Sequence, residues 1–216
     1  MQTRAKGKRT DGPARAETVA RAALALVDSG GLESLTMRRL ATSLDVQLPT
    51  IYRLFDGKQA LLDAMAETIL SGVPAEIAVD EDAGWAKRVT AFAHGLRKTL
   101  LTQRDGARIV GGNYAAQQHT HTLAETLLGG LHDAGFPAES AIWAGTTVFC
   151  YVLGEVLEQQ GATGNEVEVL ANSLRGNDFP RLAKMPVEQF VAFDARFEFG
   201  LHVVVSGLRT ALAELT

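Results

Sequence analysis

The residue types able to do covalent or metal chemistry are few and scattered. Cys150 stands between Phe149 and Tyr151, where a buried thiol is inert. His119 and His121 are two residues apart, so on a helix their side chains diverge by about 200° and cannot hold one ion together. The sequence contains no phosphate-binding loop, nucleophile elbow or His-Glu-x-x-His motif. We therefore expect no enzyme activity, no bound metal and no cofactor.

Positive charge is concentrated at the N-terminal end of this 216-residue chain, whose net charge is −4. Residues 1–58 contain ten Lys and Arg against six Asp and Glu, a balance of +4, whereas the remainder has 11 bases and 19 acids, a balance of −8. A basic head on an acidic body suits a small DNA-binding segment attached to a domain that does not touch DNA. The alternative is a solvated surface of mixed charge.

Two short helices joined by a tight turn are predicted to present part of this charge. The turn at Asp45-Val46 is too short for a strand, and Pro49 falls in a first helical turn, where its missing N–H is not needed. Each segment keeps one apolar side, formed by Leu40, Ala41 and Leu44 before the turn and by Val46, Ile51 and Phe55 after it. The pattern indicates a helix-turn-helix, whose second helix can lie in a DNA major groove.

Three side chains are placed to cap these helices. Thr36 precedes the first helix of the motif, and Asp56 precedes the following helix with Gln59 three residues later, as in a capping box. An earlier helix is predicted to open at Pro13 and to stop at Ser29-Gly30-Gly31.

The remaining pattern is helical throughout, so the predicted fold class is all-α. We expect a basic flexible arm at 1–12, a helix-turn-helix DNA-binding domain at 13–58, and a ligand-binding and dimerisation domain at 59–216. Further helices are predicted near 85–100, 116–134, 140–160 and 187–215, with a mobile segment at 161–184 that has a short helical pattern at 167–174.

The helix over 140–160 is apolar on most sides and must be covered on more than one side. A second subunit is the expected cover, through a four-helix bundle that takes two helices from each protomer; the alternative is a monomeric helical core. A single cysteine fits a reducing cytoplasm, and neither a secretory signal nor a membrane-spanning run of about 20 apolar residues is apparent. We expect a cytoplasmic homodimer without a membrane partner.

The head resembles the tetracycline repressor (TetR) family of one-component regulators. The residues that carry the resemblance there are Leu35-Thr-Met-Arg-Arg-Leu-Ala41 and Pro49-Thr-Ile-Tyr-Arg-Leu-Phe55, followed by Lys58. The resemblance continues through Arg104-Asp-Gly-Ala-Arg108, Ala134-Gly-Phe136 and Leu153-Gly-Glu-Val-Leu-Glu-Gln-Gln160, and covers about residues 13–213.

The resemblance implies contacts to double-stranded operator DNA. Arg38 is expected on a base edge or phosphate, Thr50 and Tyr52 on phosphates, Pro49 against a thymine methyl, and Lys58 on a phosphate. The expected DNA-binding set is Arg38, Leu48, Pro49, Thr50, Tyr52, Arg53 and Lys58.

Three head residues depart from the tetracycline repressors. Leu48 stands where they carry a base-reading glutamine, Leu54 where they carry histidine, and Asp45 where they carry a turn glycine. We therefore expect a different operator sequence.

The resemblance also implies a small-molecule effector, with a different pocket chemistry. Val110 aligns with the histidine that binds the magnesium of Mg²⁺-tetracycline, Asn113 with a pocket threonine, and Cys150 with another pocket histidine. An aliphatic side chain cannot coordinate Mg²⁺. The expected lining of the pocket contains these three residues together with Phe92, Leu96, Leu127, Ile142 and Phe149. Glu158 from the partner subunit is expected to complete it. This set favours an apolar or aromatic ligand without metal.

The predicted function is that of a transcriptional repressor released from a palindromic operator by its ligand. Two recognition helices would enter successive major grooves about 34–36 Å apart. The ligand would shift the fourth predicted helix, the one that follows Asp56. A regulator whose body serves only dimerisation is one alternative. An all-helical enzyme or carrier with an incidental helix-turn-helix is a more remote one.

Overall fold

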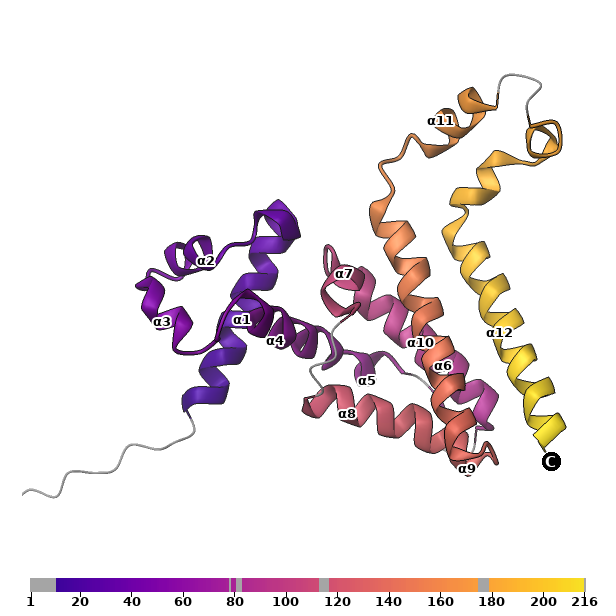
Figure 1. The fold of residues 1–216 in the computed structure, drawn as a ribbon, viewed down its shortest axis with the longest axis horizontal. Helices are drawn as coiled ribbons and strands as arrows, with labels where there is room; N and C mark the ends of the chain where they lie inside the picture. The colour runs from indigo at the N-terminus through magenta and orange to yellow at the C-terminus, as the bar shows by residue number, and fades with distance from the viewer. Residues whose placement is uncertain (1–10, 78, 81–82, 113–116, 175–178, 216) are drawn as a thin grey trace, which may run out of the picture.

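The computed structural model describes residues 11–77, 79–80, 83–112, 117–174 and 179–215. Every regular element over these ranges is a helix (Figure 1), which confirms the all-α prediction. The predicted basic arm lies outside the described residues except for Asp11 and Gly12, which already belong to the first helix.

The head consists of a long helix and a helix-turn-helix packed against it. Its elements are α1 (Asp11–Gly30), the short η1 turn (Leu32–Ser34), α2 (Met37–Ser43) and α3 (Leu48–Tyr52). α1 stops where Gly31 takes a φ of 76°, a left-handed conformation that suits glycine. The apolar sides predicted from the sequence meet in the head core, where Val27, Leu40, Ile51 and Phe55 are buried.

One predicted helix cap is confirmed and one is wrong. The Thr36 hydroxyl accepts a hydrogen bond from the Arg39 amide at 3.1 Å and caps α2. Asp56 does not cap the next helix, because α4 (Lys58–Leu70) begins one residue later, after Gly57 with a φ of 148°. The Gln59 side chain points along its own helix instead and donates to Asp63 at 2.8 Å.

α4 joins the head to a helical body (Figure 1). It packs on α1 at one end and on the body helices at the other. The body elements are α5 (Val73–Glu76), α6 (Trp85–Leu101), α7 (Gly106–Val110), α8 (Gln118–Ala124), the π-helix η2 (Glu125–Gly129), α9 (Gly130–Asp133), α10 (Ala138–Gly161), α11 (Glu166–Ser173), η3 (Leu182–Lys184), η4 (Val187–Val191) and α12 (Phe193–Leu215).

Two predicted helices are less regular than their apolar patterns indicate. The helix expected over 116–134 changes to a wider π turn at Glu125–Gly129 between α8 and α9. The adjacent Gly129 and Gly130 weaken α-helix there and make the wider turn easier to adopt. The segment from Val187 to Val191 is a 3-10 turn, so α12 starts only at Phe193.

α6, α10 and α12 form the main layer of the body, with α10 and α12 side by side (Figure 1). Buried apolar residues such as Leu96, Val148, Val152 and Phe197 fill the space between them. By length and composition alone α10 could cross a membrane, but the core helix of a soluble protein passes the same test. In this chain, 33% of that apolar stretch is buried against the rest of the body.

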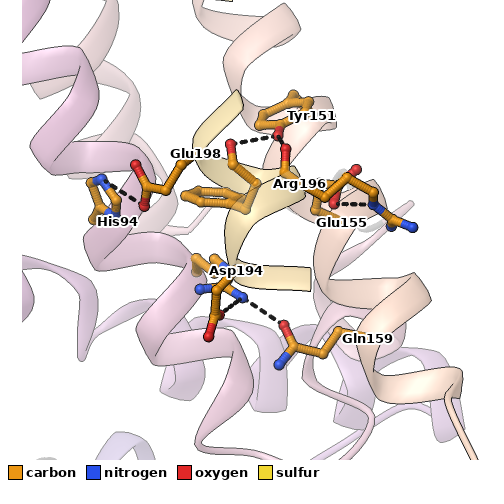
Figure 2. Close-up of polar contacts among 9 residues, drawn as sticks. His94, Tyr151, Glu155, Gln159, Asp194, Arg196 and Glu198 are labelled. Carbon is orange, nitrogen blue, oxygen red and sulfur yellow. Dashed lines mark hydrogen bonds and ion pairs between the residues drawn. The ribbon is translucent and has the colours of Figure 1, made fainter. Parts of the chain in front are cut away.

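A polar network fixes the start of α12 against α6 and α10 (Figure 2). Arg97 on α6 donates to Gln159 at 2.7 Å and pairs with Asp194 at 2.6 Å. Its guanidinium also lies over the ring of Phe197, 4.7 Å from the centroid. The Tyr151 hydroxyl donates to the Phe197 carbonyl oxygen at 2.8 Å. These contacts hold the three helices in one register.

Candidate DNA-binding head and ligand cavity

The helix-turn-helix exposes most of the side chains expected to meet DNA. Pro49 and Tyr52 of α3 are exposed, as are Arg53 directly after α3, Arg38 on α2 and Lys58 at the start of α4. Three of these five are cationic, which is the charge that phosphate contacts require. Their roles on DNA remain predictions.

Two further members of the expected DNA-binding set are partly withdrawn from solvent. Thr50 is half-buried and accepts a hydrogen bond from the Arg53 guanidinium at 3.3 Å. Leu48 is half-buried and packs against the head core. Part of the Leu48 side chain therefore supports α3 rather than facing outward.

Asp45, in the turn between α2 and α3, adopts a φ of 51°. Aspartate tolerates this left-handed conformation better than most residues. The replacement of the usual glycine is thus compatible with the turn.

A second connection between head and body runs through the turn between α6 and α7. Asp105 has a φ of 58°, and its carboxylate accepts a hydrogen bond from the Leu32 amide of η1 at 2.8 Å. The Arg104 amide donates to Asp28 at the end of α1 at 3.0 Å. Arg108 forms ion pairs with Glu33 and Asp105. The hydrogen bond to Glu33 makes the largest contribution to raising the pKa of the Arg108 guanidinium, and the hydrogen bond to Asp105 adds to it.

Gln160 at the end of α10 holds this turn in place. Its side-chain amide donates to the carbonyl oxygens of Leu100 and Gln103 at 3.0 and 2.8 Å, while its oxygen accepts from the Ala107 amide at 3.1 Å. Gly106 fits only because it lacks a Cβ, which would lie 2.3 Å from the Leu100 carbonyl oxygen. The segments 104–108 and 153–160, which both resemble the tetracycline repressors in sequence, therefore contact each other.

A cavity of about 200 Å³ lies between α4, α6, α7, α8, η2 and α10. Four residues of the expected lining border it, namely Phe92, Val110, Leu127 and Phe149. The sequence reasoning missed the rest of the lining, which is Ala66, Leu70, Thr120, Leu123, Ala124, Leu128, Gly145 and Thr146. Spacings of four, as in Ala66 and Leu70, could have indicated a shared face.

Four other expected lining residues lie outside this cavity. Leu96 is fully buried in the core one helical turn beyond Phe92. Ile142 is 52% exposed, and Cys150 is exposed too, because the cavity face of α10 carries Gly145, Thr146 and Phe149 instead. Glu158 is exposed on α10, and its predicted contact across a dimer stays a prediction. Asn113 lies outside the described residues.

The cavity is separated by Phe92 and Leu127 from a second one of about 220 Å³, which is bordered by Trp85 and Arg88 among others. The first cavity depends on Gly145, where an added Cβ would lie 2.2 Å from the Leu128 side chain. Within the described residues, no group of three His, Cys, Asp or Glu side chains is placed to hold a metal ion.

Comparison with known proteins assigns both parts of the chain. Residues 20–65 match the family described as bacterial regulatory proteins, tetR family, and residues 78–212 match the tetracyclin repressor-like C-terminal domain. The chain belongs to the TetR family. Its head is a TetR-family DNA-binding domain, and the protein is a transcriptional regulator and not an enzyme. TetR-family members are typically dimeric and ligand-responsive.

Among TetR-family relatives, the class C tetracycline repressor of Escherichia coli is 36% identical over 196 residues, covering 89% of each chain. A possible TetR family regulator from Streptomyces coelicolor A3(2) superimposes with a TM-score of 0.82 at 36% identity, covering 91% of this chain and 99% of its own. ActR of Streptomyces coelicolor, solved in complex with actinorhodin, gives a TM-score of 0.80 at 28% identity, with coverages of 91% and 97%.

Proposed function

We propose that this protein is a cytoplasmic homodimeric repressor that leaves a palindromic operator when a mainly apolar or aromatic molecule enters the 200 Å³ cavity. We assign DNA binding to residues 13–58, and ligand binding and dimerisation to residues 59–216. The observation that carries the ligand class is the lining of the cavity. Val110 presents hydrocarbon there, and Phe92 and Phe149 present aromatic rings. ActR in complex with actinorhodin supports a similar ligand class here.

The replacement of a metal-binding histidine by Val110 argues against a Mg²⁺-bound tetracycline as the effector. Mg²⁺ requires oxygen ligands or water held by polar groups, and Val110 offers neither. We propose that the effector binds without a metal.

The proposed homodimer is supported by the exposed apolar side chains on α10 and α12. Trp143 and Leu157 on α10 are 61% and 46% exposed, and Phe199 and Val203 on α12 are 72% and 51% exposed. Large apolar side chains gathered on two adjacent helices favour an interface. A partner placing the same two helices there completes a four-helix bundle.

The cavity is placed to act on both connections to the head. Ala66 and Leu70 bring the connecting helix α4 into its wall. Val110 brings α7, and the turn directly before α7 contacts η1 and α1 through Asp105 and Arg104. A ligand that spreads these walls would move the heads away from the separation of about 34–36 Å that successive major grooves require. A coupling of about 1–3 kcal/mol would lower operator affinity about five- to 150-fold.

The test is selection of operator sequences from random duplex DNA, followed by gel shifts with aromatic compounds and with Mg²⁺-tetracycline. We expect a palindromic site and release by at least one aromatic compound. Gly145→Val would fill the cavity against Leu128 and abolish release while leaving DNA binding intact. Gly161→Ala, at the exposed end of the same helix with no atom near its added Cβ, is the matched control.

Two outcomes would contradict the proposal. Release by Mg²⁺-tetracycline at lower concentration than by the aromatic compounds would overturn the ligand class. Operator binding that no compound changes would favour the alternative in which the body serves only dimerisation.

A further inference from the structure

The ligand cavity has very few polar atoms. Among its described lining residues, only Thr120 on α8 and Thr146 on α10 have polar side chains. At about 200 Å³ it exceeds the roughly 150 Å³ of an apolar cavity that binds benzene, so an aromatic ligand of two fused rings is a suitable probe. Side-chain hydrogen bonds to a ligand in this cavity must therefore come from these two hydroxyls.

The Thr120 hydroxyl has a fixed orientation because Glu67 holds it. Glu67 on α4 is only 7% exposed, and its Oε1 accepts the hydrogen of the Thr120 hydroxyl. The same carboxylate accepts from the backbone amides of Thr120 and His119 at 2.9 and 2.8 Å. Three donors from α8 therefore converge on one buried carboxylate of the connecting helix.

This arrangement determines what Thr120 can offer to a ligand. A hydroxyl has one hydrogen and two acceptor lone pairs, and here the hydrogen is already used. The remaining capacity of Thr120 is that of an acceptor. The adjacent buried carboxylate adds negative potential, which opposes an anionic ligand more strongly in this apolar setting than in water.

We propose that Thr120, held by Glu67, makes the cavity select aromatic ligands that carry a hydrogen-bond donor and no negative charge, such as phenols and aromatic amines. This inference rests on the proposed function only in taking the cavity as the effector site. Glu67 follows Ala66, a cavity residue of α4, so the ligand is recognised directly beside the helix that leads to the head.

The test compares three probes of one ring system, namely 2-naphthol, naphthalene and 2-naphthoate, by equilibrium dialysis against the full-length protein at neutral pH. The phenol donates a hydrogen bond, naphthalene does not, and 2-naphthoate is an anionic acceptor. We expect 2-naphthol to bind about three- to tenfold more tightly than naphthalene, the range that one added hydrogen bond supplies. 2-Naphthoate should bind most weakly.

Variants at Thr120 separate recognition from packing. Thr120→Val keeps the shape but removes the hydroxyl, so the preference for 2-naphthol over naphthalene should disappear while naphthalene affinity stays unchanged. Thr120→Ser keeps the hydroxyl and should restore the preference. Thr122→Val is the matched control, because the exposed Thr122 hydroxyl donates to the Gln118 carbonyl oxygen of its own helix, at 2.9 Å.

Glu67→Gln tests the contribution of the carboxylate charge, and it should narrow the gap between 2-naphthol and 2-naphthoate. The proposal is overturned if Thr120→Val weakens all three probes equally, if 2-naphthoate binds wild type best, or if wild type binds none of them. Because dialysis uses no DNA, these results are independent of operator release. A selective cavity in a protein that never leaves its operator would contradict the proposed function and leave this inference intact.

Discussion

At the scale of single residues, two aspartates share an unusual backbone conformation but differ in what their side chains do. Asp45 in the helix-turn-helix has a φ of 51° and is exposed, whereas Asp105 has a φ of 58° and bonds the Leu32 amide and Arg108. Glycine adopts such angles without steric cost. Only at Asp105 does the side chain compensate for the backbone.

Glycine substitutions should show how much each aspartate side chain contributes to the free energy of unfolding. Asp45→Gly should change the free energy of unfolding by no more than about 1 kcal/mol. Glycine removes the backbone strain of the left-handed conformation, and this gain offsets the higher conformational entropy of the unfolded chain. Asp105→Gly should lower it by about 1–3 kcal/mol, because a charge-assisted hydrogen bond is lost. Urea unfolding of both variants measures this. Equal effects would show that the Asp105 side chain adds nothing.

Tyr151 gives the protein a predicted weakness at alkaline pH. Burial, with the nearby Glu155 adding to it, raises the pKa of the Tyr151 phenol to about 12. The folded state therefore favours the protonated phenol, and this contribution to stability is present below pH 10 and lost between about pH 10 and 12. Tyr151→Phe should lose about 1 kcal/mol at neutral pH through the missing bond to the Phe197 carbonyl.

The same variant should then be less sensitive to alkali than wild type. Unfolding curves taken on both sides of pH 10 provide the comparison. An identical decline in the two proteins would mean that another group causes it.

At the scale of elements, the end of α10 positions α7. Gln160 supplies all three of the hydrogen bonds described above to Leu100, Gln103 and Ala107. Gln160→Leu should lower the free energy of unfolding by about 2 kcal/mol or more, because buried backbone groups lose their partners. Amide hydrogen exchange should accelerate over residues 106–110. Glu158→Gln, at an exposed position of the same turn, should leave both quantities unchanged.

Element positions follow from the sequence where apolar periodicity is strong. The stripe from Trp85 to Leu100 and the apolar run of α10 both became helices as predicted. Periodicity could not predict the π turn at Glu125–Gly129, because the same apolar spacing suits both helix types over one turn. It also failed at Asp56, since the backbone geometry of Gly57 sets the helix start.

The cavity was harder to predict than the fold. Val110 was found because it aligns with a pocket histidine of the tetracycline repressors, and Phe92, Leu127 and Phe149 were among the further lining candidates named with it. Thr120 and Gly145 instead depend on how α8 and α10 approach each other. Neither residue belongs to a motif. The Glu67 contact spans 53 positions to Thr120, a distance along the chain that no local pattern reports.

At the scale of the whole molecule, the exposed faces of α10 and α12 lead to a prediction about assembly. Phe199→Glu would bury a charge in the proposed bundle and should convert the dimer to a monomer in sedimentation experiments. Operator affinity should fall at least about tenfold, since one head then binds one half-site. Phe179→Glu, at a 58% exposed position outside both helices, is the control. A dimer that persists in Phe199→Glu would place the interface elsewhere.

The π turn in the cavity wall has a consequence for how this protein could change over evolutionary time. Such a turn holds one residue more than the α-helical turn it replaces, so a single deletion could close it and rotate the following segment by about 100°. Leu127 lies within that turn and borders both cavities, and Leu131 follows the turn and borders the second cavity. Loss of one codon could therefore reshape the ligand site at once, without any change in the residues that hold the head.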